Sequence, residues 1–356
     1  MGREQGWRSA WLALVCACAC ACGVDQEEAE PDRSRPWKFG ERSSGDLVVT
    51  WRVSPEAFEE DPSIWIGFGF DEDVVVEADT DDDGIFEYRG EEVFRKTIEG
   101  PGVYTVWLRG NMTQARFCDS GTEDITIEQW GRTRWDTMQF MFFTCKSVHI
   151  ADEVGPDLTD VQDMSSMFSY AAQVSGSLEG WDVSNVRDMS FMFTTVKEWN
   201  VSLASWDVSS VRNMNNMFSD NEGIEGGLDT WDVSSVEDME AMFQRAGRFV
   251  GDVSGWDVSN VTDMSHMFML ASSFNSNLSG WDISSVSDMT DMFIGAGLSA
   301  RNYDATLTGW LSRGDAPRDV DFDASGLTYC EAADARATLI AEYGWTFEGD
   351  TLSCGQ

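Results

Sequence analysis

The sequence predicts an α/β repeat solenoid, with one short strand and one short helix in each coil, preceded by a small all-β sandwich. The motif Trp-Asp-Val/Ile-Ser recurs every 25 residues, and the pentad Met-x-x-Met-Phe starts eight residues after each of its tryptophans. A constant period between 20 and 50 residues indicates stacked repeats. The tryptophans are Trp181, Trp206, Trp231, Trp256 and Trp281, and the pentads start at Met189, Met214, Met239, Met264 and Met289, with further copies at Met164 and Met138.

Residues 1–22 are expected to be a lipoprotein signal peptide. Two arginines precede an apolar run that is too short to span a bilayer, and the run ends in cysteines. Cys22 is the favoured site of acylation, with Cys18 and Cys20 as alternatives. Residues 23–44 are charged and lack periodicity, which predicts an acidic disordered tether. The chain is therefore expected to be exported and lipid-anchored at a bacterial outer membrane or cell surface.

Residues 45–118 alternate β-branched and aromatic residues with a period of two between turn residues, which predicts a small antiparallel sandwich. The expected strands include 47–53, 64–68, 74–76, 85–88 and a last one within 101–110. The segment PGVYTVWLRG, from Pro101 to Gly110, resembles the last strands of PKD-like immunoglobulin-fold domains. Residues 79–90 depart from the tryptophan-bearing motif usual in that fold.

An acidic loop in this region is the candidate metal site. Asp79, Asp81, Asp83 and Glu87 fall at positions 1, 3, 5 and 9 of a calcium-binding loop, but Gly90 replaces the glutamate at position 12. Two interpretations stay open: a Ca²⁺ site, or an acidic β-turn without a ligand. Calcium is the one cofactor that the sequence suggests.

Residues 119–160 are expected to form an N-terminal cap and first coil, and residues 161–300 the 25-residue repeats. Within a repeat, Val286, Met289, Met292 and Phe293 have the spacing of one helix face. The Met, Phe and Trp columns are interpreted as core, because Met fills gaps against aromatic rings. One more apolar column is Val174, Trp199, Ile224, Phe249 and Phe274.

An aspartate follows each repeat tryptophan, so that these carboxylates align from coil to coil. They could form a cation-binding ladder, or they could accept hydrogen bonds from the adjacent turn, which we favour. His266 is expected to be solvated. The aspartates are Asp182, Asp207, Asp232, Asp257 and Asp282.

Eight cysteines in an exported chain favour disulfides, and their spacing does not match a zinc site. Cys330 and Cys354 flank the C-terminal cap expected at residues 301–356, and we predict that they pair. A second pair, Cys118 with Cys145, would tie the N-terminal domain to the first coil.

The repeats resemble those of BspA-type leucine-rich-repeat proteins, which are bacterial surface lipoproteins. The resemblance rests on WDVSNVTDMSHMF, from Trp256 to Phe268, and on its sister copies. Ile125–Cys145 is similar to that family's first coil, and Leu307–Phe347 is similar to its C-terminal cap. The resemblance implies a horseshoe or arc with a role in adhesion or recognition, and it implies no catalytic residues.

The formal net charge of −39 disfavours duplex nucleic acid, whose binding needs Lys and Arg. The chain lacks the sequence motifs of nucleophilic, phosphate-binding and zinc-protease sites. We therefore expect a monomeric, non-catalytic scaffold that binds a protein or surface polymer and touches the membrane through its lipid anchor alone. Solenoids bind through extended faces. The expected partner face is one variable position in consecutive coils: Arg187, Arg212, Glu237, Thr262 and Ser287.

Two other functions make different predictions. A glycan-binding module would expose some of the repeat tryptophans as stacking platforms. A hydrolase would place carboxylates of raised pKa in a deep pocket, in the sandwich or near Trp130 to Trp135.

Overall fold

The computed structural model spans residues 1–356, and the part described here is 45–55, 65–69, 75–79, 88–91, 93–97, 100–109, 114–118 and 124–354. The predicted signal peptide and tether lie outside the described residues, and so do Cys22, Cys18 and Cys20. Most of the predicted calcium loop is also outside them: of its four candidate ligands only Asp79 is described, as the last residue of a strand.

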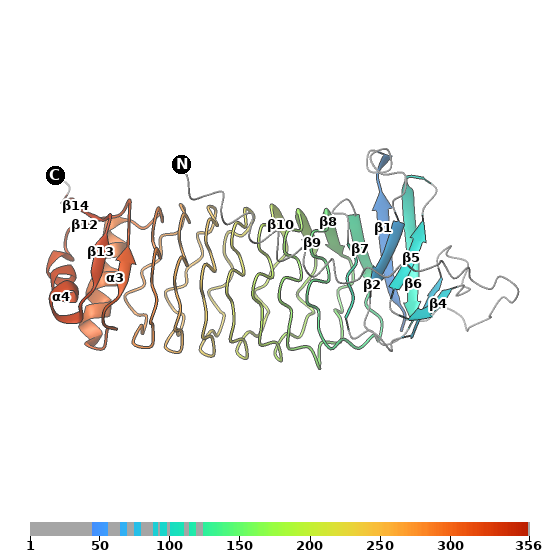
Figure 1. Ribbon diagram of the computed structural model, residues 1–356, viewed down its shortest axis with the longest axis horizontal. Helices are drawn as coiled ribbons and strands as arrows, with labels where there is room; N and C mark the ends of the chain where they lie inside the picture. The colour runs from blue at the N-terminus through green and yellow to red at the C-terminus, as the bar shows by residue number, and fades with distance from the viewer. Residues whose placement is uncertain are drawn as a thin grey trace, which may run out of the picture. The chain divides into compact units, whose positions relative to one another are not determined.

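An eight-stranded sheet joins the N-terminal strands to the first coils (Figure 1). Its strand order is β10-β9-β8-β7-β1-β6-β3-β4. Strand β1 pairs antiparallel with both β6 and β7, whereas β7 pairs in parallel with β8. The strands are β1 (Leu47–Val53), β3 (Val75–Asp79), β4 (Tyr88–Glu91), β6 (Gly102–Arg109), β7 (Asp124–Gln129), β8 (Ser147–Ile150), β9 (Gln173–Gly176) and β10 (Glu198–Asn200). The sheet thus continues across residue 118, where the sequence suggested a boundary between two domains.

Strand β1 shows why the N-terminal segment forms strands. Leu47, Val49, Trp51 and Val53 are buried on one face, whereas on the other face Val48 is buried, Thr50 is half-buried and Arg52 is exposed. A separate antiparallel pair consists of β2 (Trp65–Gly69) and β5 (Val93–Thr97). The sequence did not anticipate β5.

From residue 163 onward, consecutive coils are held in a 25-residue register by backbone contacts. The N–H of Met189 donates to the carbonyl of Asn213 at 3.0 Å, and that of Phe193 donates to Met217 at 2.9 Å. Parallel bridges link the residue before each pentad to its counterpart in the next coil: Asp163, Asp188, Asn213, Asp238, Asp263 and Asp288. Figure 1 shows these coils side by side.

The prediction of a short helix in each coil is wrong for these repeats. In the pentad that starts at Met189, the N–H of Met192 donates back to Met189, three residues earlier, while Phe191 donates to Asn215 of the next coil. Phe191 has a φ of 56°, in the left-handed region. In an α-helix, each N–H after the first turn donates to the carbonyl four residues earlier, and a helix of two turns is marginal by itself. Hydrogen bonds to the neighbouring coil take the place of those within a helix, and the pentads form successive tight turns.

The repeat core is a continuous stack of aromatic rings. Seven phenylalanines pack face to face, with ring centroids 5.2–5.9 Å apart: Phe142, Phe168, Phe193, Phe218, Phe243, Phe268 and Phe293. All seven are buried, and so are the Met pentad residues and the five repeat tryptophans, which are 0–4% exposed. The Nε1 of Trp256 donates to the carbonyl of Leu228 at 3.0 Å, and Trp206, Trp231 and Trp281 make the equivalent bond. These tryptophans are therefore core and cannot act as exposed platforms.

The C-terminal cap closes this stack. Helix α3 (Ala300–Arg313) brings Trp310 to 6.4 Å from Phe293, nearly parallel to its ring. The other elements are β11 (Asp321–Asp323), β12 (Thr328–Tyr329), α4 (Ala333–Tyr343), β13 (Thr346–Glu348) and β14 (Thr351–Leu352). A disulfide joins Cys330 to Cys354, and another joins Cys118 to Cys145. These are the two pairings that the sequence favoured.

Candidate binding surfaces

The five variable residues form one exposed row, which we call the variable row: Arg187, Arg212, Glu237, Thr262 and Ser287. From Arg212 onward, the N–H of each member donates to the carbonyl of the member in the preceding coil, at 2.8–2.9 Å. The backbone of the row is therefore rigidly spaced, while its side chains differ in charge and size from coil to coil.

The side chains of the variable row differ in how they are held. Arg212 and Glu237 form an ion pair at 2.9 Å, with 62% and 57% of their side chains exposed. Such exposed pairs contribute little to stability. The hydroxyls of Thr262 and Ser287 donate to backbone carbonyls of the preceding coil at 3.0 Å. The row therefore offers a partner charged groups at one end and small polar groups at the other.

The aspartates after the repeat tryptophans serve their own turns. The Oδ1 of Asp207 accepts the backbone N–H and the hydroxyl of Ser209 at 3.1 and 2.6 Å. Asp182, Asp232, Asp257 and Asp282 accept the equivalent N–H two residues on. The hydrogen bond from the Ser234 hydroxyl lowers the pKa of Asp232. Among the described residues no group of three or more His, Cys, Asp or Glu is arranged to hold a metal ion.

A second, mostly acidic column directly precedes the pentads, at the residues that the parallel bridges join: Asp163, Asp188, Asn213, Asp238, Asp263 and Asp288. Its members are half-buried, and each Oδ1 accepts the N–H two residues on, as Asp238 does from Glu240 at 2.8 Å. Burial raises the pKa of Asp238, and the neighbouring carboxylates of Asp263 and Asp188 add to the effect. In the preceding coil Asn213 takes this position and donates to Asp188 at 3.2 Å.

We predict that Asp238→Asn stabilises the protein at pH 7 by roughly 0.2–1 kcal/mol, the range of a like-charge pair on adjacent strands. Because the folded-state pKa is raised, ionisation of Asp238 works against folding, and its cost appears as pH rises through that pKa. The gain should therefore disappear in acid, where the wild-type carboxyl is protonated. Denaturant unfolding at pH 7 and below pH 3.8 measures both values. Equal or lower stability at pH 7 would contradict this prediction.

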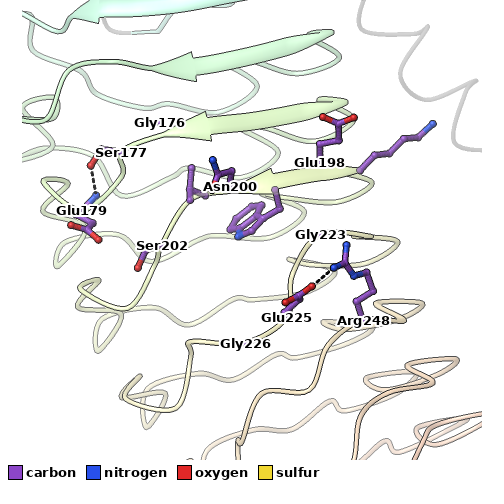
Figure 2. Close-up of a pocket in the computed structure, with 13 residues that line it drawn as sticks. Gly176, Ser177, Glu179, Glu198, Asn200, Ser202, Gly223, Glu225, Gly226 and Arg248 are labelled. Atoms are coloured by element: carbon purple, nitrogen blue, oxygen red, sulfur yellow. Dashed lines mark hydrogen bonds and ion pairs between the residues drawn. The ribbon is translucent and has the colours of Figure 1, made fainter.

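A pocket of about 690 Å³ lies on another part of the coils, beside β10 (Figure 2). Strand β10 and the residues around it contribute Lys197, Glu198, Trp199, Asn200, Val201 and Ser202, and the preceding coil contributes Gly176, Ser177 and Glu179. Gly223, Glu225 and Gly226 come from the next coil and Arg248 from the one after. Four consecutive coils therefore line it, about half a coil away in sequence from the variable row.

Sequence reasoning missed this pocket because it assigned Trp199 to the core. The other members of its column, Val174, Ile224, Phe249 and Phe274, are at most 2% exposed, whereas Trp199 is half-buried. The usable signal was local: Trp199 is the largest residue of its column, and Gly223 precedes the equivalent Ile224 in the next coil.

The other proposed sites are placed as follows. His266 is 33% exposed, and its Nε2 lies 3.5 Å from Asp291, so it is partly covered and not simply solvated. Trp130 and Trp135 pack edge to face at 6.1 Å and are 1% exposed, and Asp152 accepts a hydrogen bond from the backbone N–H of Trp130. The junction suggested for a hydrolase is thus filled by indole rings.

Comparison with protein families assigns the repeats. The model described as "Mycoplasma protein of unknown function, DUF285" matches residues 136–226 and again residues 217–313, which together make up half of the chain. The chain belongs to the DUF285 family. No curated protein and no solved structure gives a match. The DUF285 region contains the variable row, the pocket and most of the aromatic stack, so these features belong to the family's part of the chain.

In the described part of this DUF285 protein, no helix is both long and apolar enough to cross a membrane.

Proposed function

We propose that this DUF285 protein is a non-catalytic binding scaffold on a bacterial cell surface, which recognises a protein or surface polymer through the variable row. The observation that supports this most is the contrast between buried and exposed columns. Core positions repeat the same residues, whereas Arg187, Arg212, Glu237, Thr262 and Ser287 change at one exposed position. A fixed core that displays a changing row is how stacked repeats create an extended binding face.

The surface location is part of the proposal. Residues 1–22 have the composition of a lipoprotein signal, and Cys22 is the proposed anchor. Two disulfides in the described residues suit an oxidising compartment outside the cytoplasm. The resemblance to BspA-type repeats supports the same location and an adhesive role. Labelling with a radioactive fatty acid, compared between the full chain and its Cys22→Ser variant, tests the anchor separately.

Site-specific photo-cross-linking tests the variable row even while the partner is unidentified. A photoreactive amino acid replaces one residue of the variable row at a time in the full chain, which is expressed in the organism that naturally produces it. We expect at least three of the five positions to cross-link to the same species. Replacing the five residues together by alanine should weaken that contact by about 2 kcal/mol or more, as for the central residues of an interface.

The matched control is a second column of five in consecutive coils: Tyr170, Thr195, Asp220, Arg245 and Leu270. These residues have φ between 53° and 62°. The control variant therefore replaces all five by asparagine instead of alanine, because asparagine tolerates that conformation. Cross-linking from the control column to the same species with equal yield, or none from the variable row, would reject the row as the partner face.

A further inference from the structure

The indole of Trp199 presents one face to the pocket. Its ring is perpendicular to those of Phe193 and Phe218, at centroid distances of 4.8 and 6.2 Å. Those two phenylalanines stack on each other at 5.7 Å, so Trp199 lies beside both and cannot lie between them. Their edges therefore cover one face of the indole. Trp199 lines the pocket and is half-buried, so the opposite face is the one available to a ligand.

The next coil approaches Trp199 closely at Gly223. A Cβ at Gly223 would lie 2.2 Å from the Cβ of Trp199, and one at Gly226 would lie 3.3 Å from Gly251. Any side chain at Gly223 would thus displace the tryptophan or fill the pocket. The chain forms no strand at residues 223–226, so β10 is the last strand of the eight-stranded sheet.

The polar lining offers hydrogen-bond donors and acceptors, and charged groups of both signs. Arg248 pairs with Glu225, and Lys197 and Glu198 are neighbours in the sequence, so Glu179 leaves the lining with one net negative charge. Asn200, Ser177 and Ser202 add neutral groups, and Figure 2 shows Glu198, Asn200 and Ser202 around the pocket. This net charge disfavours an anionic ligand, and Lys197 and Arg248 would repel a polycation. A ligand rich in hydroxyl groups, which both donate and accept, matches this lining.

We propose that this pocket binds a neutral linear oligosaccharide, with one sugar ring stacked on Trp199. The lining from four consecutive coils favours a chain of sugars along the stack over a single ring, and the volume lies within the range of ligand pockets. The proposal rests on the non-catalytic binding function, for which it names one ligand class, but it uses a surface separate from the variable row.

Calorimetry and tryptophan fluorescence of the full chain, with serine at the four N-terminal cysteines, test it against cellohexaose, maltohexaose, xylohexaose and chitohexaose. We expect at least one to bind and to change the fluorescence. Trp199→Ile should weaken that binding by at least about tenfold, while Trp199→Phe keeps part of it. Isoleucine is a fair replacement because Ile224 fills the same column in the next coil. Unfolding of both variants confirms that the coil is intact.

Binding of none of the four sugars, or equal binding by wild type and Trp199→Ile, would overturn the proposal. Tetralysine is the ionic comparison: if it binds at Trp199 and the sugars do not, the site recognises cations. The alanine variant of the variable row should bind the sugar normally. Failure of the sugar site would leave the cross-linking result of the row unaffected, and the reverse also holds.

Discussion

Replacing Asp350 by alanine is expected to destabilise the C-terminal cap by about 3–5 kcal/mol, the cost of leaving a buried charge without its partner. The Asp350 side chain is fully buried and accepts two hydrogen bonds from Arg336, at 2.8 and 2.9 Å. It also accepts the Tyr303 hydroxyl at 3.0 Å. Burial raises the pKa of Tyr303 well above its usual range, so this hydroxyl stays a donor.

Arg336 would be the group left behind. It lies over the rings of Tyr329 and Phe347, at 5.1 and 4.5 Å from their centroids, and its side chain is 19% exposed. Denaturant unfolding measures the loss. The control is Arg212→Ala, which removes an exposed ion pair and should change stability by no more than about 1 kcal/mol. Similar small effects for both substitutions would show that Asp350 does not hold the cap together.

Replacing Phe243 by alanine should cost about 3–5 kcal/mol, because it opens a cavity in the middle of the aromatic stack. Phe243 is fully buried. It stacks on Phe218 at 5.6 Å, on Phe268 at 5.7 Å and on Phe249 at 4.0 Å. Phe243→Leu retains most of the volume and should cost less than about 1.5 kcal/mol.

The pattern of unfolding adds a second readout. Each coil contacts its two neighbours, so a weak coil in the middle can let the two halves of the stack unfold separately. We expect Phe243→Ala to lower the denaturant midpoint and to broaden the transition or split it in two. A sharp transition at the wild-type midpoint would mean that neighbouring residues repack into the cavity without loss of stability, and it would contradict the prediction.

One of the two candidate sites, the variable row, could be predicted from the sequence pattern, and the other, the pocket, could not. The variable row follows from the period alone, because residues 25 apart occupy equivalent places whatever the backbone between them does. The pocket could not be predicted this way. It depends on Trp199 in one coil and on the close approach of Gly223 in the next, and a comparison of single columns does not reveal such a pair.

The sequence by itself determined the register of the coils and most of the core, with Trp199 as an exception, and it predicted both disulfide pairings. Trp281 and Phe268 are buried because each coil must hide the same apolar set against its neighbours. Only the tertiary structure decided the backbone of the pentads. Met189 and Met192 share a face in a helix, but also in successive turns that close every three residues. The choice between them depended on hydrogen bonds to the next coil, which are invisible in local periodicity.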